Sequence, residues 1–146
     1  MKYKLIIDKN AEEEIIAVVH GPSALTRQIE DLVRSYEGRD CIMGYREDEM
    51  RKLEFSEIEC ITILDRKVMA IDGEGKHYRI QERLRDLEEI LPSYFIRINK
   101  SAIANETHIQ KFAANFSGAV DVVFRGGYRE YVSRRCFAQI KRRYGI

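Results

Sequence analysis

The sequence predicts an α+β fold that is mainly β, in which a small ββα(β) unit precedes a larger domain of several sheets. Short apolar runs rich in β-branched residues, separated by turn residues, recur through most of the chain. Only three segments carry the spacing of an amphipathic helix. A chain of 146 residues suits one domain, or one domain with a small annex, and needs neither disulfides nor a metal to fold.

The first 40 residues predict two strands and a helix. Residues 2–8 alternate between apolar and polar side chains, and residues 15–19 form a continuous apolar run, so both predict strands. The acidic segment between them predicts the turn of an antiparallel hairpin. Apolar residues then recur at helical spacing from Leu25 to Tyr36, with Gly38 predicted to end the helix. One helix covers only one face of a sheet, so the other face must pack on the rest of the chain or on a second copy. We therefore expect residues 1–40 to dimerise the protein or to set its geometry.

Residues 41–146 predict the larger domain, and its elements follow one another at short intervals. Strands are expected at 41–45, 50–54, 60–64, 68–71, 76–80, 94–98, 108–115, 119–124 and 128–132, with a one-turn connector at 55–58 and a loop or single turn at 101–105. A short helix is expected over 84–91, where Pro92 stops it, and a last helix after Ser133 as N-cap. The Arg125-Gly126-Gly127 segment predicts a hairpin turn.

Charge is distributed unevenly along this nearly neutral chain. Residues 1–48 carry 7 Lys/Arg against 10 Asp/Glu, residues 49–91 carry 8 against 11, and residues 92–146 carry 10 against 3. A strongly basic last third favours an anionic partner, of which nucleic acid is the obvious polyanion. A merely solvated basic face is the alternative.

Two arginines stand where a helix would favour acidic residues. Arg134 and Arg135 fall in the first turn of the last predicted helix, at the positive end of its dipole. Together with the Ser133 hydroxyl and the free backbone N–H groups, they would form a site for phosphate and base edges. The alternative is that both arginines pair with Glu130 or other acids.

Three further groups of polar and basic residues could contact DNA, but each group taken alone is weak evidence for that role. Asn99, Lys100 and Ser101 follow a strand, and Arg66 and Lys67 form a hairpin tip. Alone, each would be an ordinary polar turn. Arg142 lies near the C-terminus of the last helix, where phosphate contact and simple complementation of the helix dipole are equally good explanations.

Nothing in the sequence indicates catalysis, a cofactor or a metal. The three histidines are scattered, no phosphate-binding glycine loop occurs, and no candidate nucleophile has a recognisable base. Cys41, Cys60 and Cys136 are widely spaced and predict free thiols in a reducing cytoplasm. We also expect neither a signal peptide nor a membrane-spanning segment.

Four blocks of the sequence resemble the LytTR-type DNA-binding domain of bacterial transcriptional regulators. They are Phe55 to Ile61, Leu84 to Pro92, Phe95 to Asn105, and Gly127 to Arg135. The region that matches the family covers about 70% of the chain, and the order and spacing of the four blocks make the match specific. The resemblance implies a mostly β domain of several small sheets, whose loops enter successive major grooves of DNA without a recognition helix.

The resemblance also implies which residues contact DNA. Base-reading positions fall on the 65–67 turn, on Lys100 and on Arg135, while Asn99, Ser101, Ser133 and Arg134 would support them at phosphates. The 65–67 turn is shorter than usual in the family, so either Arg66 or Lys67 could fill the first position. Lys100 replaces the usual Arg or Asn, and Ala102 replaces a bulkier residue.

The sequence thus predicts a stand-alone, sequence-specific regulator that binds double-stranded DNA as a homodimer on repeated sites. About 40 residues precede the matching region, too few for a receiver domain, so we expect control by dimer formation, expression level or a separate regulatory protein partner. The expected location is the cytoplasm, on the nucleoid when bound. The alternative reading is a non-enzymatic protein-interaction module whose basic face binds an acidic partner.

Overall fold

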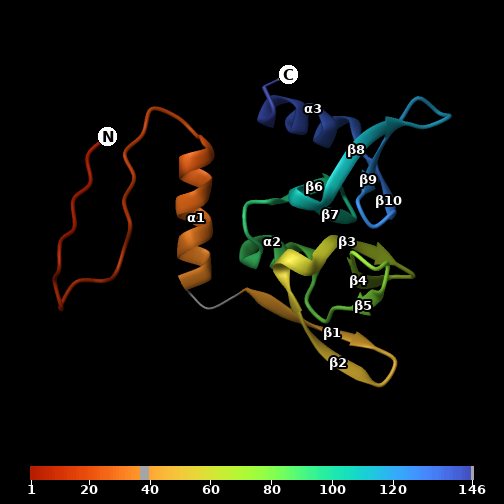
Figure 1. Ribbon diagram of the computed structural model, residues 1–146, viewed down its shortest axis with the longest axis horizontal. Helices are drawn as coiled ribbons and strands as arrows, with labels where there is room; N and C mark the ends of the chain where they lie inside the picture. The colour runs from red at the N-terminus through yellow and green to blue at the C-terminus, as the bar shows by residue number, and fades with distance from the viewer. Residues whose placement is uncertain (37–39, 146) are drawn as a thin grey trace.

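A seven-stranded antiparallel sheet forms the larger part of the structure (Figure 1). The computed structural model describes residues 1–36 and 40–145. The strands of this sheet follow the order β2-β1-β5-β4-β3-β7-β6. Their bounds are β1 Cys41–Arg46, β2 Glu49–Glu54, β3 Ile58–Leu64, β4 Lys67–Asp72, β5 His77–Arg79, β6 Phe95–Asn99 and β7 Ala102–Asn105.

A second, three-stranded sheet follows in the chain and has the order β10-β9-β8. Its strands are β8 Ile109–Ala114, β9 Val120–Phe124 and β10 Arg129–Val132. Three α-helices accompany the sheets, namely α1 Ala24–Tyr36, α2 Leu84–Ile90 and α3 Arg134–Arg143. Short 3-10 turns at Phe55–Glu57 and Glu106–His108 lead into β3 and β8.

The buried apolar side chains form two cores, one on each side of β3 and β7. The first lies between the large sheet and α2, and includes Ile58, Ile61 and Leu87. The second lies between β6, β7, the three-stranded sheet and α3, and includes Ile98, Phe124 and Ile140. The four residues of β7 are buried without alternation because β7 is covered on both faces.

A buried carboxylate joins the two sheets at one end. Glu59, which is 1% exposed, accepts hydrogen bonds from the backbone N–H of Gly126 at 3.0 and 3.2 Å. His108 Nδ1 lies 3.1 Å from the same carboxylate, and its Nε2 lies 2.6 Å from the carbonyl oxygen of Ser56. A charge buried at this depth is tolerated because several partners satisfy it.

Most predicted elements of residues 41–145 are confirmed, including the hairpin around residues 125–127 and the Ser133 N-cap, whose side chain accepts from the N–H of Cys136. The loop expected at 101–105 is wrong, because Ala102–Asn105 forms strand β7 between β3 and β6. Its small and apolar residues lack the alternation that would have indicated a strand. The expected helix end at Gly38 lies outside the described residues.

The hairpin predicted at the N-terminus is also corrected. Residues 2–8 and 15–19 are extended arms around a turn, where Ala11 N–H donates to the Asp8 carbonyl oxygen at 3.4 Å, but they form no strand ladder. Every residue of the arms is exposed. An isolated two-stranded hairpin is marginally stable in water, and no other described element covers the arms (Figure 1). The predicted helix is confirmed as α1.

The close approach at Gly126 leads to a test of the junction between the sheets. A Cβ atom there would lie 2.5 Å from Glu59 Oε1 and 2.6 Å from the Gly73 carbonyl oxygen. We expect Gly126→Ala to lower the free energy of unfolding by about 1–3 kcal/mol in urea titrations, because backbone must move. Gly73→Ala is the matched control. A Cβ at Gly73 meets nothing within 4 Å, so the change should stay within about 0.5 kcal/mol. Equal effects of the two changes would contradict this packing.

Candidate nucleic-acid interface

The β3–β4 hairpin ends in a two-residue turn that presents basic side chains. Asp65 and Arg66 have φ angles of 50° and 65°, and Leu64 pairs with Lys67 across the turn. Two left-handed residues in succession are the backbone of a type I′ turn, which matches the twist of a tight hairpin. Arg66 and Lys67 are exposed, so their basic groups project from a short and firmly paired hairpin.

The β6–β7 turn is equally tight and presents Lys100. The Asn99 side chain accepts a hydrogen bond from the Ser101 N–H at 2.7 Å, so the amide itself closes the turn. Lys100 at the tip is exposed, and Ser101 is half-buried. The local hydrogen bond therefore fixes the backbone from which the Lys100 side chain extends.

Helix α3 begins at the end of β10 with its cations facing outward. Ser133 accepts from the N–H of Cys136 at 3.2 Å, which satisfies one of the free donors of the first turn. Arg134 and Arg135 are exposed on that turn. Arg142 lies seven residues after Arg135, two helical turns along, and is also exposed, so the two arginines occupy the same face of α3.

Backbone hydrogen bonds bring these three segments to one end of the large sheet. Ile63 N–H, beside the β3–β4 turn, donates to the Ser101 carbonyl oxygen at 3.0 Å. Ser133 N–H, at the start of α3, donates to the Ile98 carbonyl oxygen at 2.8 Å. Figure 1 shows the β3–β4 tip and the first turn of α3 on the same side of the molecule. We call this surface the cationic edge; it comprises Arg66, Lys67, Lys100, Arg134 and Arg135.

Beneath the cationic edge, Glu130 connects all three segments. Its carboxylate accepts from Thr62 Oγ1 on β3 at 3.2 Å, from Asn99 Nδ2 on β6 at 3.4 Å, and from the Tyr128 hydroxyl at 2.8 Å. Burial, and then the hydrogen bond to Glu130, raise the pKa of Tyr128 above its usual value. The sequence alone did not single out Glu130; its signal is an acid retained in a strongly basic segment.

Asn99 does not contact the solvent, which corrects its expected position at a phosphate. It is 1% exposed, and its amide nitrogen also donates to the Tyr131 carbonyl oxygen at 2.8 Å. With its oxygen used by Ser101, every strong hydrogen-bonding group of this side chain is engaged within the protein. Asn99 therefore shapes the cationic edge from below.

The cations of the edge are free of acidic partners. Across residues 1–36 and 40–145, no carboxylate lies within ion-pairing distance of the five edge residues or of Arg142, whereas Arg97, Arg129 and Arg143 pair with Glu88, Asp121 and Glu106. The alternative in which Glu130 neutralises Arg134 and Arg135 is not what the structure shows, because Glu130 binds uncharged donors. Unpaired exposed cations at one edge are available to an external anion.

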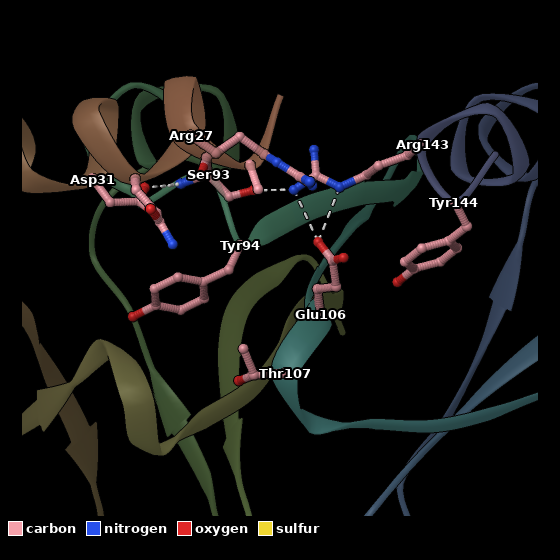
Figure 2. A pocket seen from close by; sticks show the side chains of 10 residues that line it. Arg27, Asp31, Ser93, Tyr94, Glu106, Thr107, Arg143 and Tyr144 are labelled. Atoms are coloured by element: carbon pink, nitrogen blue, oxygen red, sulfur yellow. Dashed lines mark hydrogen bonds and ion pairs between the residues drawn. The ribbon is translucent and has the colours of Figure 1, made fainter. Parts of the chain in front are cut away.

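A shallow pocket of about 450 Å³ lies elsewhere, where α1 meets the end of α3 (Figure 2). Arg143 donates to Glu106 at 3.0 Å and to the Ser93 carbonyl oxygen at 2.8 Å, and Ser93 N–H donates to Asp31 of α1 at 2.7 Å. These polar groups satisfy one another. The pocket is therefore a contact between α1 and the β domain.

The described part of the chain offers no residues for a metal site or a membrane-spanning helix. No group of three or more His, Cys, Asp or Glu side chains could hold a metal ion there. None of the described helices is long and apolar enough to cross a membrane. The three cysteines are free, and burial raises the pKa of the Cys60 thiol well above its usual value.

Comparison with known proteins identifies the family of the β domain. The model of the LytTr DNA-binding domain matches residues 48–145. The chain belongs to the LytTR family. The family suggested by the four sequence blocks is thus confirmed, as are the mainly β fold and the LytTR-like architecture.

Relatives and a solved structure extend this result. An uncharacterised HTH-type transcriptional regulator of Staphylococcus aureus (strain NCTC 8325 / PS 47) is 30% identical over 152 residues, covering 100% of this chain and 99% of the relative. A counterpart from strain COL matches equally. The LytTr DNA-binding domain of a methyl-accepting/DNA response regulator from Bacillus cereus superimposes with a TM-score of 0.67 at 22% identity, covering 75% of this chain and 100% of that one.

The helices of this LytTR protein are not arranged as a helix-turn-helix. In that motif a short turn joins two consecutive helices. Between α1 and α2 the described residues form five strands, and between α2 and α3 they form five more. The relatives are thus named for a helix arrangement that the described part of this chain lacks.

The buried position of Asn99 gives a prediction with a defined pH dependence. Asn99→Asp replaces a donor by a second carboxylate beside Glu130, so we expect it to lower the free energy of unfolding by about 3 kcal/mol at pH 7. Repulsion in the fold would raise the pKa of the new carboxyl above its unfolded value of about 3.9, so the electrostatic part of the loss should be absent well below that pH and grow as pH rises above it. Urea unfolding at both pH values measures this. Asn10→Asp, at an exposed turn, should cost less than about 0.5 kcal/mol; an equal cost at both sites would exclude this arrangement.

Proposed function

We propose that this LytTR protein is a transcriptional regulator of the cytoplasm that binds specific sequences of double-stranded DNA through its cationic edge. The protein carries a LytTR DNA-binding domain, and its relatives are named as transcriptional regulators. In the proposal, two copies bind repeated sites, and a separate protein could control them. The two turns and the start of α3 enter the major groove.

The observation that carries this proposal is the convergence of three unpaired cationic segments on one rigid edge. Each segment begins at a strand end or a helix start, and hydrogen bonds join each to its neighbour. A rigid backbone beneath the binding side chains favours specific recognition, because fewer conformations are lost on binding. A solvated basic face would require neither the convergence nor the hydrogen-bonded Glu130 beneath it.

Within the edge, we assign base contacts to the basic side chains at the three tips. Arg135 would donate two hydrogen bonds to guanine, which is the commonest specific contact in the major groove. Lys100 would reach guanine from the middle turn, and Arg66 or Lys67 would occupy the third position. Because Lys100 offers a single point charge and no planar fork, its base preference should be broader than that of Arg135.

Phosphate contacts would come from the residues around these tips. Ser133 and Arg134 flank the free N–H groups of α3, and Ser101 adjoins Lys100. Arg142 would reach a further phosphate along the same face of α3. These contacts would position the protein without distinguishing one base from another.

Selection of bound duplexes from a random pool, followed by sequencing, tests the proposal. We expect a short repeated motif whose spacing reports two copies. Enrichment of no motif would reject sequence-specific binding, and equal affinity for an acidic polypeptide would favour the protein-interaction alternative. Repeating the selection with Arg66→Ala and with Lys67→Ala identifies which residue reads the third position, because only the reader's loss should relax one base.

Two arginines on the same face of α3 provide a matched comparison. On a selected duplex, Arg135→Ala should cost about 1–3 kcal/mol of binding and relax one base position. Arg142→Ala should weaken all duplexes alike and reduce the slope of log K against log salt by about 1. Fluorescence anisotropy with selected and scrambled duplexes at several salt concentrations measures both. Identical behaviour of the two variants would contradict the division into readers and anchors.

A further inference from the structure

The N-terminal unit, residues 1–36, exposes apolar side chains in a way that no other part of the described chain does. Its large apolar side chains are mostly more than half exposed, with Ile16 at 73% and Val18 at 93%. Besides the terminal Met1, the exposed set is Tyr3, Leu5, Ile6, Ile7, Ile15, Ile16, Val18, Val19, Leu32 and Tyr36. Monomeric soluble proteins rarely expose so many apolar groups together, so this surface is expected to be covered.

Helix α1 contacts the β domain through its polar side. Asp31 accepts from Ser93 N–H at 2.7 Å, and Arg34 donates to the Leu91 carbonyl oxygen. With 3.6 residues per turn, these two positions face away from the stripe that includes Ile29, Leu32 and Tyr36. None of the residues of α1 is fully buried. The helix thus turns its apolar stripe away from the domain on which it rests.

The two arms lie on that same outer side. In Figure 1 they run out and back beyond α1, away from both sheets. The other described elements therefore leave the apolar arms uncovered. The 15–19 arm is apolar on both of its faces, so a single α1 could cover only half of it.

We infer that a second copy of this chain covers the N-terminal unit, and that the arms of two copies pair into one four-stranded sheet flanked by the two α1 helices. Two strands alone are marginal, whereas three or more strands with an apolar face are stable. Pairing two copies supplies the missing strands and the second helix at once. Each copy contributes the same surface to the other, as a two-fold axis requires.

The available area matches a dimer of this kind. Burying an aliphatic side chain removes on the order of 100 Å² from water. The ten exposed side chains therefore offer roughly 1,000 Å² per chain, compared with about 800 Å² per partner in a stable interface. These ten side chains are numerous enough for a permanent interface even if α1 of the same chain covers part of their surface.

Charge favours a second copy over a strongly charged partner. Residues 1–36 contain five Lys/Arg and six Asp/Glu, so two such units repel one another little. The unit lacks the excess of one sign that an acidic protein, a nucleic acid or an anionic membrane surface would select. The interface also lies opposite the cationic edge, which would leave both edges of a dimer accessible (Figure 1).

The inference concerns a surface apart from the cationic edge, and its test uses no DNA. Sedimentation of the full chain over a range of concentrations should give twice the 17.1 kDa chain mass. Leu32→Glu and Ile16→Glu should each raise the dimer dissociation constant about tenfold or more, because each would bury a charge. Gln28→Glu on α1 and Asn10→Glu at the turn add the same charge at exposed polar positions and should change the constant less than about twofold.

Two further readouts keep the test independent of folding. All four residues lie on the surface of the single chain, so thermal unfolding of the β domain should be unchanged in each monomeric variant. Amide hydrogens of residues 2–8 and 15–19 should be protected from exchange in the wild type, and lose protection on dilution. A monomer at all concentrations, a dimer that tolerates both apolar-to-Glu changes, or unprotected arms in a dimer would each overturn the inference.

Discussion

The half-buried carboxylate of Glu130 makes the hydrogen bonds on which the geometry of the cationic edge depends. It lies where β3, the end of β6 and β10 meet, and donors from each of these strands or their neighbours satisfy it. Asn99 extends this network to the backbone of Tyr131 and closes the Lys100 turn. Each polar group in the network is costly to leave unpaired, so the three segments cannot move independently without losing several hydrogen bonds.

This network also explains why an acid persists in the most basic part of the chain. A negative charge beneath the edge offsets part of the repulsion among five exposed cations, while its uncharged partners leave those cations free for an external anion. At the other end of the large sheet, Glu59 performs a similar structural task through Gly126 and His108. One buried carboxylate, Glu59, and one half-buried carboxylate, Glu130, thus fix the three-stranded sheet against the large one. That placement in turn sets the position of α3 and its arginines.

The sequence predicted much of this architecture because most strands alternate and most turns carry their own signals. Ser133 as N-cap, Pro92 as helix stop and the Gly126-Gly127 turn are local features, and local physics decides them. Strand β7 was missed since its burial on both faces depends on partners far away in the chain. Asn99 was assigned to the surface for the same reason: its partners Glu130 and Tyr131 lie 31 and 32 residues away. The N-terminal arms have strand patterns but lack, in a single chain, the neighbours that would make them a sheet.

The central claim is that three segments form one DNA-reading edge, and backbone NMR during titration with a selected duplex tests it most directly. Amide signals of residues 64–67, 99–101 and 133–135 should shift together along a single binding curve. The 125–127 turn, which packs on the far end of the large sheet, should remain unchanged. Shifts confined to one of the three segments, or centred on the 125–127 turn, would contradict the account.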